Sequence, residues 1–169
     1  MSFVPVDVAD LIGQPGAFRE IGVRGTPDEH LATAVAEVPG EVAADLLLES
    51  VVEGIIVSGR LSGTFSLRCA RCLEAFERPL AIDVHELFAE RPDPDGDEYP
   101  LEPEGLLDVG PMALDAIGLE MPFSPLCRPD CLGICEVCGG NRNLGECPGH
   151  EQIDPRWAGL EAALERMHD

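Results

Sequence analysis

The sequence predicts an α+β fold in which an antiparallel sheet forms the core, one helix returns the chain to a cysteine-rich lobe, and a further helix lies at the C-terminal end. Three observations indicate this. β-Branched and apolar residues alternate roughly over residues 41–89, apolar residues recur at helical spacing after residue 106, and five of the seven cysteines fall between Cys127 and His150. We expect an α+β core domain over residues 1–126, a cysteine-rich lobe over 127–150 and a C-terminal helix over 151–169.

The N-terminal third of the chain gives the weaker predictions. Residues 1–19 contain a short apolar piece that ends at a turn of glycine and proline residues, and residues 20–40 suit either short strands or one weak helix. The antiparallel strands of the core follow, with Gly54, Gly59 and Gly63 spaced as turns or bulges between them. This part of the chain should therefore form the body of the sheet.

A C-x2-C pair, Cys69 and Cys72, lies between two predicted strands. We expect it at the end of one strand, with the chain turning over residues 73–77 before the next strand at residues 79–88. The thiols would then lie on a hairpin turn. Residues 90–105 are rich in carboxylates and prolines and predict a solvated loop or disordered linker; the alternative is an acidic surface for a basic partner.

Residues 106–126 predict a helix that covers the sheet. Pro111 suits its first turn, and Pro122 and Pro125 end it, so that the chain is aimed at Cys127. Apolar side chains that could face the sheet are Met112, Ile117, Leu119 and Met121. Near the C-terminal end, Asp154 and Pro155 suit a helix start, followed by apolar residues at helical spacing that begin with Trp157, which is more often a packing anchor than a binding residue.

The cysteine-rich lobe has the spacing of a metal site. C-x2-C and C-x2-H pairs lie close together, so that a tetrahedral Cys3His zinc site can close within one short ribbon; its ligands would be Cys135, Cys138, Cys147 and His150. Gly139 and Gly140 follow the second thiol, where a zinc knuckle turns backbone amides toward sulfur and positive φ is cheapest at glycine. The lobe is therefore expected to resemble a zinc ribbon.

Four thiols remain for a second zinc ion: Cys69, Cys72, Cys127 and Cys131. The spacing alone does not exclude a rival pairing, in which Cys127, Cys131, Cys135 and Cys138 share one ion and the other four ligands form a second site or none. A set of disulfides is disfavoured, because seven is an odd number and the N-terminal residues lack the features of a secretory signal. A cytoplasmic protein with two zinc ions is the expectation, and no stretch predicts a membrane span.

The formal net charge is −21, from 11 basic and 32 acidic residues. Affinity for nucleic acids depends largely on basic side chains, so direct binding to RNA or DNA is disfavoured unless a local arginine patch outweighs this charge. A basic protein is the better partner.

Several of these motifs together resemble the YceD family, the large ribosomal RNA subunit accumulation proteins. The similar stretches are Cys69 to Leu73, His85 to Phe88, Met121-Pro122, Pro125 to Cys127, and Cys131 to Gly139, within residues 40–150. The resemblance implies a role in large ribosomal subunit biogenesis, with no catalytic residues carried over, and a ribosomal protein or an assembly intermediate as partner.

Catalysis is not expected. Catalytic zinc keeps an open position beside three protein ligands, whereas eight candidate ligands here fill two closed sites. The alternatives are a thiol redox protein that uses Cys69 and Cys72, with Arg68 and Arg71 lowering a thiol pKa, and a zinc-stabilised interaction module unrelated to ribosomes. Against the redox interpretation, the sequence around Cys69 and Cys72 does not predict the βαβ unit in which such redox motifs lie. The presence of Arg68 and Arg71 is explained by compensation of the negative charge of the metal site.

Overall fold

A computed structural model of the chain describes residues 2–26 and 31–150, which fall into two compact units. The first, here the core unit, comprises Met1–Ala70 and Glu74–Pro129. The second, the cysteine unit, comprises Arg71–Leu73 and the chain from Asp130 onward. The predicted C-terminal helix with Trp157 lies outside the described residues.

The core unit is built on two sheets and one α-helix, α1 (Gly110–Glu120). The strands are β1 (Ser2–Phe3), β2 (Val6–Asp7), β3 (Phe18–Thr26), β4 (Ala36–Glu37), β5 (Val42–Ser50), β6 (Ile55–Arg68), β7 (Ala75–Ala89), β8 (Tyr99–Pro100) and β9 (Leu106–Leu107). Two short 3-10 helices are η1 (Pro103–Gly105) and, in the cysteine unit, η2 (Arg142–Leu144). The order in the large sheet is β1-β3-β5-β6-β7-β8, with β4 also paired to β6, and β2 pairs with β9 in a small second sheet.

The α+β class is confirmed, but the sheet is mixed rather than wholly antiparallel. Neighbouring strands of the large sheet pair antiparallel, except β7 and β8, which pair in parallel. The acidic segment after β7 loops back so that β8 runs parallel to the end of β7, with Tyr99 paired to Phe88. The rings of these two residues stack with centroids 5.3 Å apart. Leu101 is buried just beyond, so the prediction of a disordered linker over residues 90–105 is wrong at its C-terminal end.

The strands follow the alternation of the sequence. Every second residue of β5 is buried, from Val42 to Ser50, as expected of a sheet with one covered face. The described residues between positions 20 and 40 contain most of β3 and all of β4 and no helix, so the weak-helix alternative is wrong for them. Gly54 lies in the turn before β6, but Gly59 and Gly63 lie inside this strand and do not break it. Gly59 has a φ of +149°, and an added Cβ would lie only 2.2 Å from the carbonyl oxygen of Asp45, so this position requires glycine.

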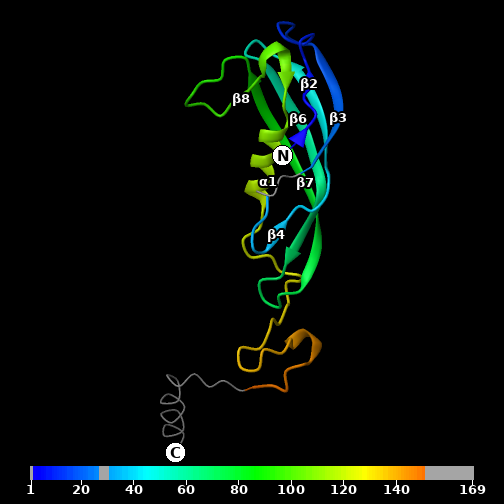
Figure 1. Ribbon diagram of the computed structural model, residues 1–169, viewed down its shortest axis with the longest axis vertical. Coiled ribbons are helices and arrows are strands. Elements are labelled where there is room, and N and C mark those ends of the chain that lie inside the picture. The colour runs from blue at the N-terminus through cyan, green and yellow to red at the C-terminus, as the bar shows by residue number, and fades with distance from the viewer. Residues whose placement is uncertain (1, 27–30, 151–169) are drawn as a thin grey trace, which may run out of the picture. The chain divides into compact units, whose positions relative to one another are not determined.

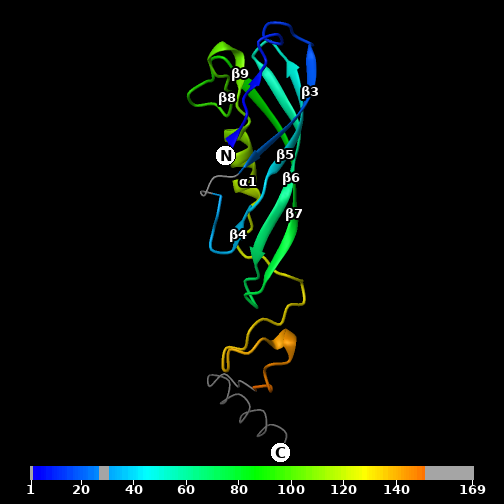
Figure 2. The same cartoon turned by 45° about the vertical axis from the view of Figure 1, so that its right-hand side comes forward.

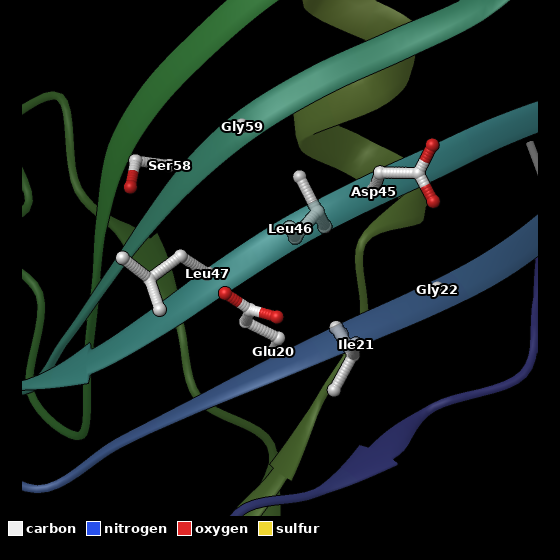
Figure 3. Close-up of a pocket in the computed structure, with 8 residues that line it drawn as sticks. All are labelled: Glu20, Ile21, Gly22, Asp45, Leu46, Leu47, Ser58 and Gly59. Carbon is white, nitrogen blue, oxygen red and sulfur yellow. The ribbon is translucent and has the colours of Figure 1, made fainter.

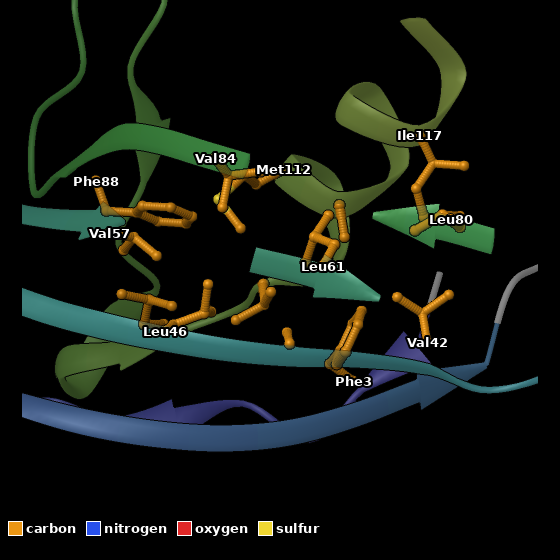
Figure 4. Close-up of a cluster of buried hydrophobic side chains, with 14 of the residues drawn as sticks. Phe3, Val42, Leu46, Val57, Leu61, Leu80, Val84, Phe88, Met112 and Ile117 are labelled. Atoms are coloured by element: carbon orange, nitrogen blue, oxygen red, sulfur yellow. The ribbon is translucent and has the colours of Figure 1, made fainter. Parts of the chain in front are cut away.

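Buried side chains of the sheet and of α1 form the core shown in Figure 4. Both cartoon views show α1 alongside the long strands (Figures 1 and 2). Met112, Ile117 and Met121 are buried as predicted, whereas Leu119 is 88% exposed. Because successive helical residues are about 100° apart, Leu119 lies about 200° around the helix from Ile117, on the side away from the sheet. No helix among the described residues has the length and apolarity that crossing a membrane requires.

Candidate metal centres

The eight predicted ligands lie in two groups of four, which are those of the first pairing considered above. One group, here the first cluster, is Cys69, Cys72, Cys127 and Cys131; the other, the second cluster, is Cys135, Cys138, Cys147 and His150. Within each group the candidate ligand atoms all lie within 4.8 Å of one another. A tetrahedral zinc site with Zn–S bonds of about 2.3 Å has sulfurs about 3.8 Å apart, so each group has a suitable size. The structure thus groups the ligands by the first pairing and not by the rival one.

The first cluster begins on the turn of the β6–β7 hairpin, as predicted. The pairing of Arg68 with Ala75 closes the hairpin, and the N–H of Cys69 donates to the carbonyl of Glu74 at 2.9 Å. The N–H of Ala70 donates to the carbonyl of Pro125 at 2.8 Å. The proline-rich segment after α1 therefore runs beside this turn and brings Cys127 toward Cys69.

Cys72 and Cys131 are held by contacts within the cysteine unit. The carbonyl of Arg71 accepts the N–H of Ile134 at 3.0 Å, and its guanidinium donates to the carbonyl of Cys131 at 3.1 Å. Gly133, with a φ of +73°, lies against the carbonyl of Arg71, and an added Cβ would be 3.0 Å from that oxygen. Glycine is therefore needed at position 133, where the backbone passes close to that of Arg71.

The second cluster has the backbone of a metal knuckle. The N–H of Cys135 donates to the carbonyl of Gly140, and the N–H of Gly139 donates back to the carbonyl of Cys135, both at 2.8 Å. Gly139 has a φ of +72°, as predicted, whereas Gly140 is not left-handed. Gly140 is instead needed for space, because an added Cβ would lie 3.0 Å from the carbonyl of Glu146.

This knuckle favours a thiolate at Cys135. The backbone N–H groups of Cys138 and Val137 are directed at its sulfur and, with the neighbouring thiols, lower the pKa of Cys135 to about 7, against the effect of its burial. At Cys147 the N–H of Gly149 acts in the same direction, but burial and the thiols of Cys135 and Cys138 outweigh it and raise the pKa. A thiolate is the form that binds zinc, so one ligand of the second cluster is ready for a metal near neutral pH.

Two asparagines that the sequence analysis did not single out support the first cluster. The side-chain amide of Asn143 donates to the sulfur of Cys131 at 3.4 Å and its oxygen accepts the N–H of Leu132 at 2.9 Å. Asn141, which is buried, accepts from both the backbone and the side chain of Asn143. Hydrogen bonds of this kind orient the ligands of metal sites. Their only signal in the sequence is the short polar run between glycines at residues 140–145.

The described part of the cysteine unit buries no aliphatic or aromatic side chain. Its buried residues are Cys72, Cys131, Gly133, Cys135 and Asn141. The larger apolar residues are exposed instead: Leu73, Leu132, Ile134, Val137 and Leu144. Thiols thus occupy the interior that a hydrophobic core fills in other small units.

A separate hollow of about 560 Å³ lies on the outer face of the sheet, over β3, β5 and β6 (Figure 3). Two of its lining residues, Gly22 and Gly59, are glycines and have no side chain to fill it. Among the residues that line it, all in the described part of the chain, Glu20 and Asp45 are the titratable ones. Ser58 pairs with His85 across β6 and β7, but His85 is not among the residues that line the hollow.

Comparison with known proteins was informative for the family and not for the fold. The family model of the large ribosomal RNA subunit accumulation protein YceD matches residues 57–163. Uncharacterized proteins of Mycobacterium bovis and Mycobacterium tuberculosis are 40% identical over 94% of this chain and 80% of their own length. An uncharacterized protein of Mycobacterium leprae is 31% identical over 97% of this chain and 79% of its own. No solved structure matches the chain.

Proposed function

Since the chain belongs to the YceD family of large ribosomal RNA subunit accumulation proteins, we propose that it is a non-catalytic, zinc-binding factor in large ribosomal subunit biogenesis. The observation that supports the zinc is the described part of the cysteine unit, whose buried side chains are thiols and one amide rather than a hydrophobic core. A polypeptide of this kind needs a metal to offset the entropy of ordering it. Each cluster supplies four ligands to one ion, which makes two zinc ions per chain.

The role of these ions is structural. Four protein ligands complete a tetrahedron and leave no position for a substrate or an activated water molecule. We therefore propose no enzymatic activity, and a cytoplasmic location, because thiols that hold zinc must stay reduced.

The partner that we propose is a basic ribosomal protein or an assembly intermediate that displays one. The support is the net charge of −21, which repels the phosphates of RNA and attracts cationic protein segments. Direct contact with RNA would need a local arginine patch.

The first experiment is a sucrose-gradient profile of ribosomal particles from cells depleted of the protein, with the level of each precursor ribosomal RNA. We expect a deficit of large subunits while small subunits are spared. A normal profile with normal precursor levels would contradict the ribosomal role and leave a zinc-stabilised interaction module.

The thiol redox alternative makes a different prediction for Cys69 and Cys72. Both are buried, with 0% and 5% of their surface exposed, whereas a reactive dithiol is partly exposed. Alkylation of the native protein separates the two functions: zinc-held thiols react only after a chelator is added, and a redox pair reacts at once.

A further inference from the structure

We infer that a groove between α1 and the β7–β8 edge of the core unit is the docking site for a cationic segment of a partner protein, one in which arginine or lysine side chains flank an apolar anchor. The groove has a volume of about 920 Å³. It lies wholly within the core unit and is separate from both cysteine clusters. Its lining combines carboxylates from three elements with apolar side chains of the helix.

The charge of the groove is of one sign. Glu86 comes from β7, Asp97 and Glu98 from the loop before β8, and Asp115 from α1. None of the described residues that line it is basic. Four carboxylates that converge from three separate elements leave a negative potential with no cation of the lining to offset it, which favours a cationic ligand.

Two of the four carboxylates accept hydrogen bonds that hold them in place. Asp115 accepts a hydrogen bond of 2.9 Å from the hydroxyl of Tyr99, and Glu98 accepts one of 2.9 Å from the N–H of Asp93. Burial and the hydrogen bond to Asp115, with the charges of Asp115, Glu86 and Asp97, raise the pKa of Tyr99 to about 12. The raised pKa of the Tyr99 hydroxyl thus reflects the same negative potential that a cationic ligand in the groove would experience.

The apolar side of the groove accounts for a helix residue that does not face the core. Leu119 is 88% exposed, and Leu114, five residues before it on the same helix, is partly buried; both line the groove. An exposed leucine in a groove that is also lined by carboxylates suits an amphipathic cationic segment better than a free ion, because it offers contact area that only a side chain can use. This inference rests on the proposed function for the class of partner, a basic ribosomal protein, and adds the surface that binds it.

The test uses the zinc-loaded full chain and fluorescence anisotropy of a labelled peptide of arginine and leucine at helical spacing. A second peptide replaces each leucine with glycine and keeps the charge. We expect the first peptide to bind, and to bind about tenfold more weakly when Asp97→Asn and Glu98→Gln are combined. The matched control, Glu20→Gln with Asp45→Asn in the hollow of Figure 3, removes the same charge and should change the affinity less than about twofold.

The apolar contact has its own variant. Leu119→Ala should weaken the arginine–leucine peptide about fivefold and leave the arginine–glycine peptide unchanged. Three results would overturn the inference: no binding of the first peptide, equal losses in the two double variants, or an RNA oligonucleotide that binds the groove with the same sensitivity to Leu119→Ala. The peptide test uses no ribosomes, so its outcome is independent of the sucrose-gradient profile. If the peptide does not bind but depleted cells still show a deficit of large subunits, the groove is rejected as the docking site and the proposed function stands.

Discussion

Removing the metal from the cysteine unit should unfold that unit and leave the core unit intact. The reason is the difference in what each unit buries. The core unit has a continuous cluster of buried aliphatic and aromatic side chains, whereas the described part of the cysteine unit buries three thiols, a glycine and an asparagine. With no hydrophobic core among its described residues, this part of the cysteine unit has little besides its ligands to stabilise it.

The backbone hydrogen bonds in the described part of the unit are too few to replace the metal. Such bonds, like those donated by Cys135, Gly139 and Arg142, contribute about 1 kcal/mol each, while ordering costs about 1–2 kcal/mol for every residue. Structural zinc in small peptides supplies about 10–16 kcal/mol. Without zinc, the free energy of folding of the unit should be unfavourable.

Hydrogen exchange read by mass spectrometry measures this directly. After chelation, the amides of Cys135, Gly139 and Arg142 should exchange within about tenfold of the rate in an unfolded chain, while those of β5 stay protected. Cys138→Ser should lower zinc from two ions per chain to about one, and Leu144→Ser, at an exposed position of the same unit, should leave two. Retention of slow exchange in protein shown to contain no zinc would refute the argument.

The remaining predictions concern single contacts. Tyr99 is the one tyrosine of the chain, so absorbance near 295 nm should show its ionisation at about pH 12. Because the pKa of Tyr99 is raised in the folded state, the stability that this shift contributes is complete below about pH 10 and is lost as the pH rises toward 12. Asp115→Asn removes a neighbouring charge and should lower that midpoint, and an unchanged midpoint would refute the assignment. Gly59→Ala places a Cβ against a backbone carbonyl and should lower the free energy of unfolding by about 2–4 kcal/mol in urea titrations, whereas Gly63→Ala, with no atom nearer than 3.5 Å, should cost less than about 1 kcal/mol. Asn143→Ala removes a donor to a ligand sulfur and should weaken zinc about 10–100-fold in chelator competition; equal affinity would show that this hydrogen bond does not tune the site.

The sequence by itself was sufficient for the class of fold and for the candidate ligands. Alternation with a period of two marks β5, and proline marks both ends of α1, because these signals arise from local backbone geometry. The C-x2-C and C-x2-H spacings are local in the same way, since two ligands of one knuckle must lie within a few residues of each other.

The tertiary structure decided what depends on contacts between distant segments. It groups Cys69 and Cys72 with Cys127 and Cys131, a choice that spacing leaves open, because chain separation does not determine which pairs meet. It keeps Gly59 inside a strand, where a neighbouring backbone rather than a turn requires glycine. It also leaves Leu119 exposed and brings carboxylates of three elements into the lining of one groove with it, which no local pattern could predict, since the elements are far apart in the sequence.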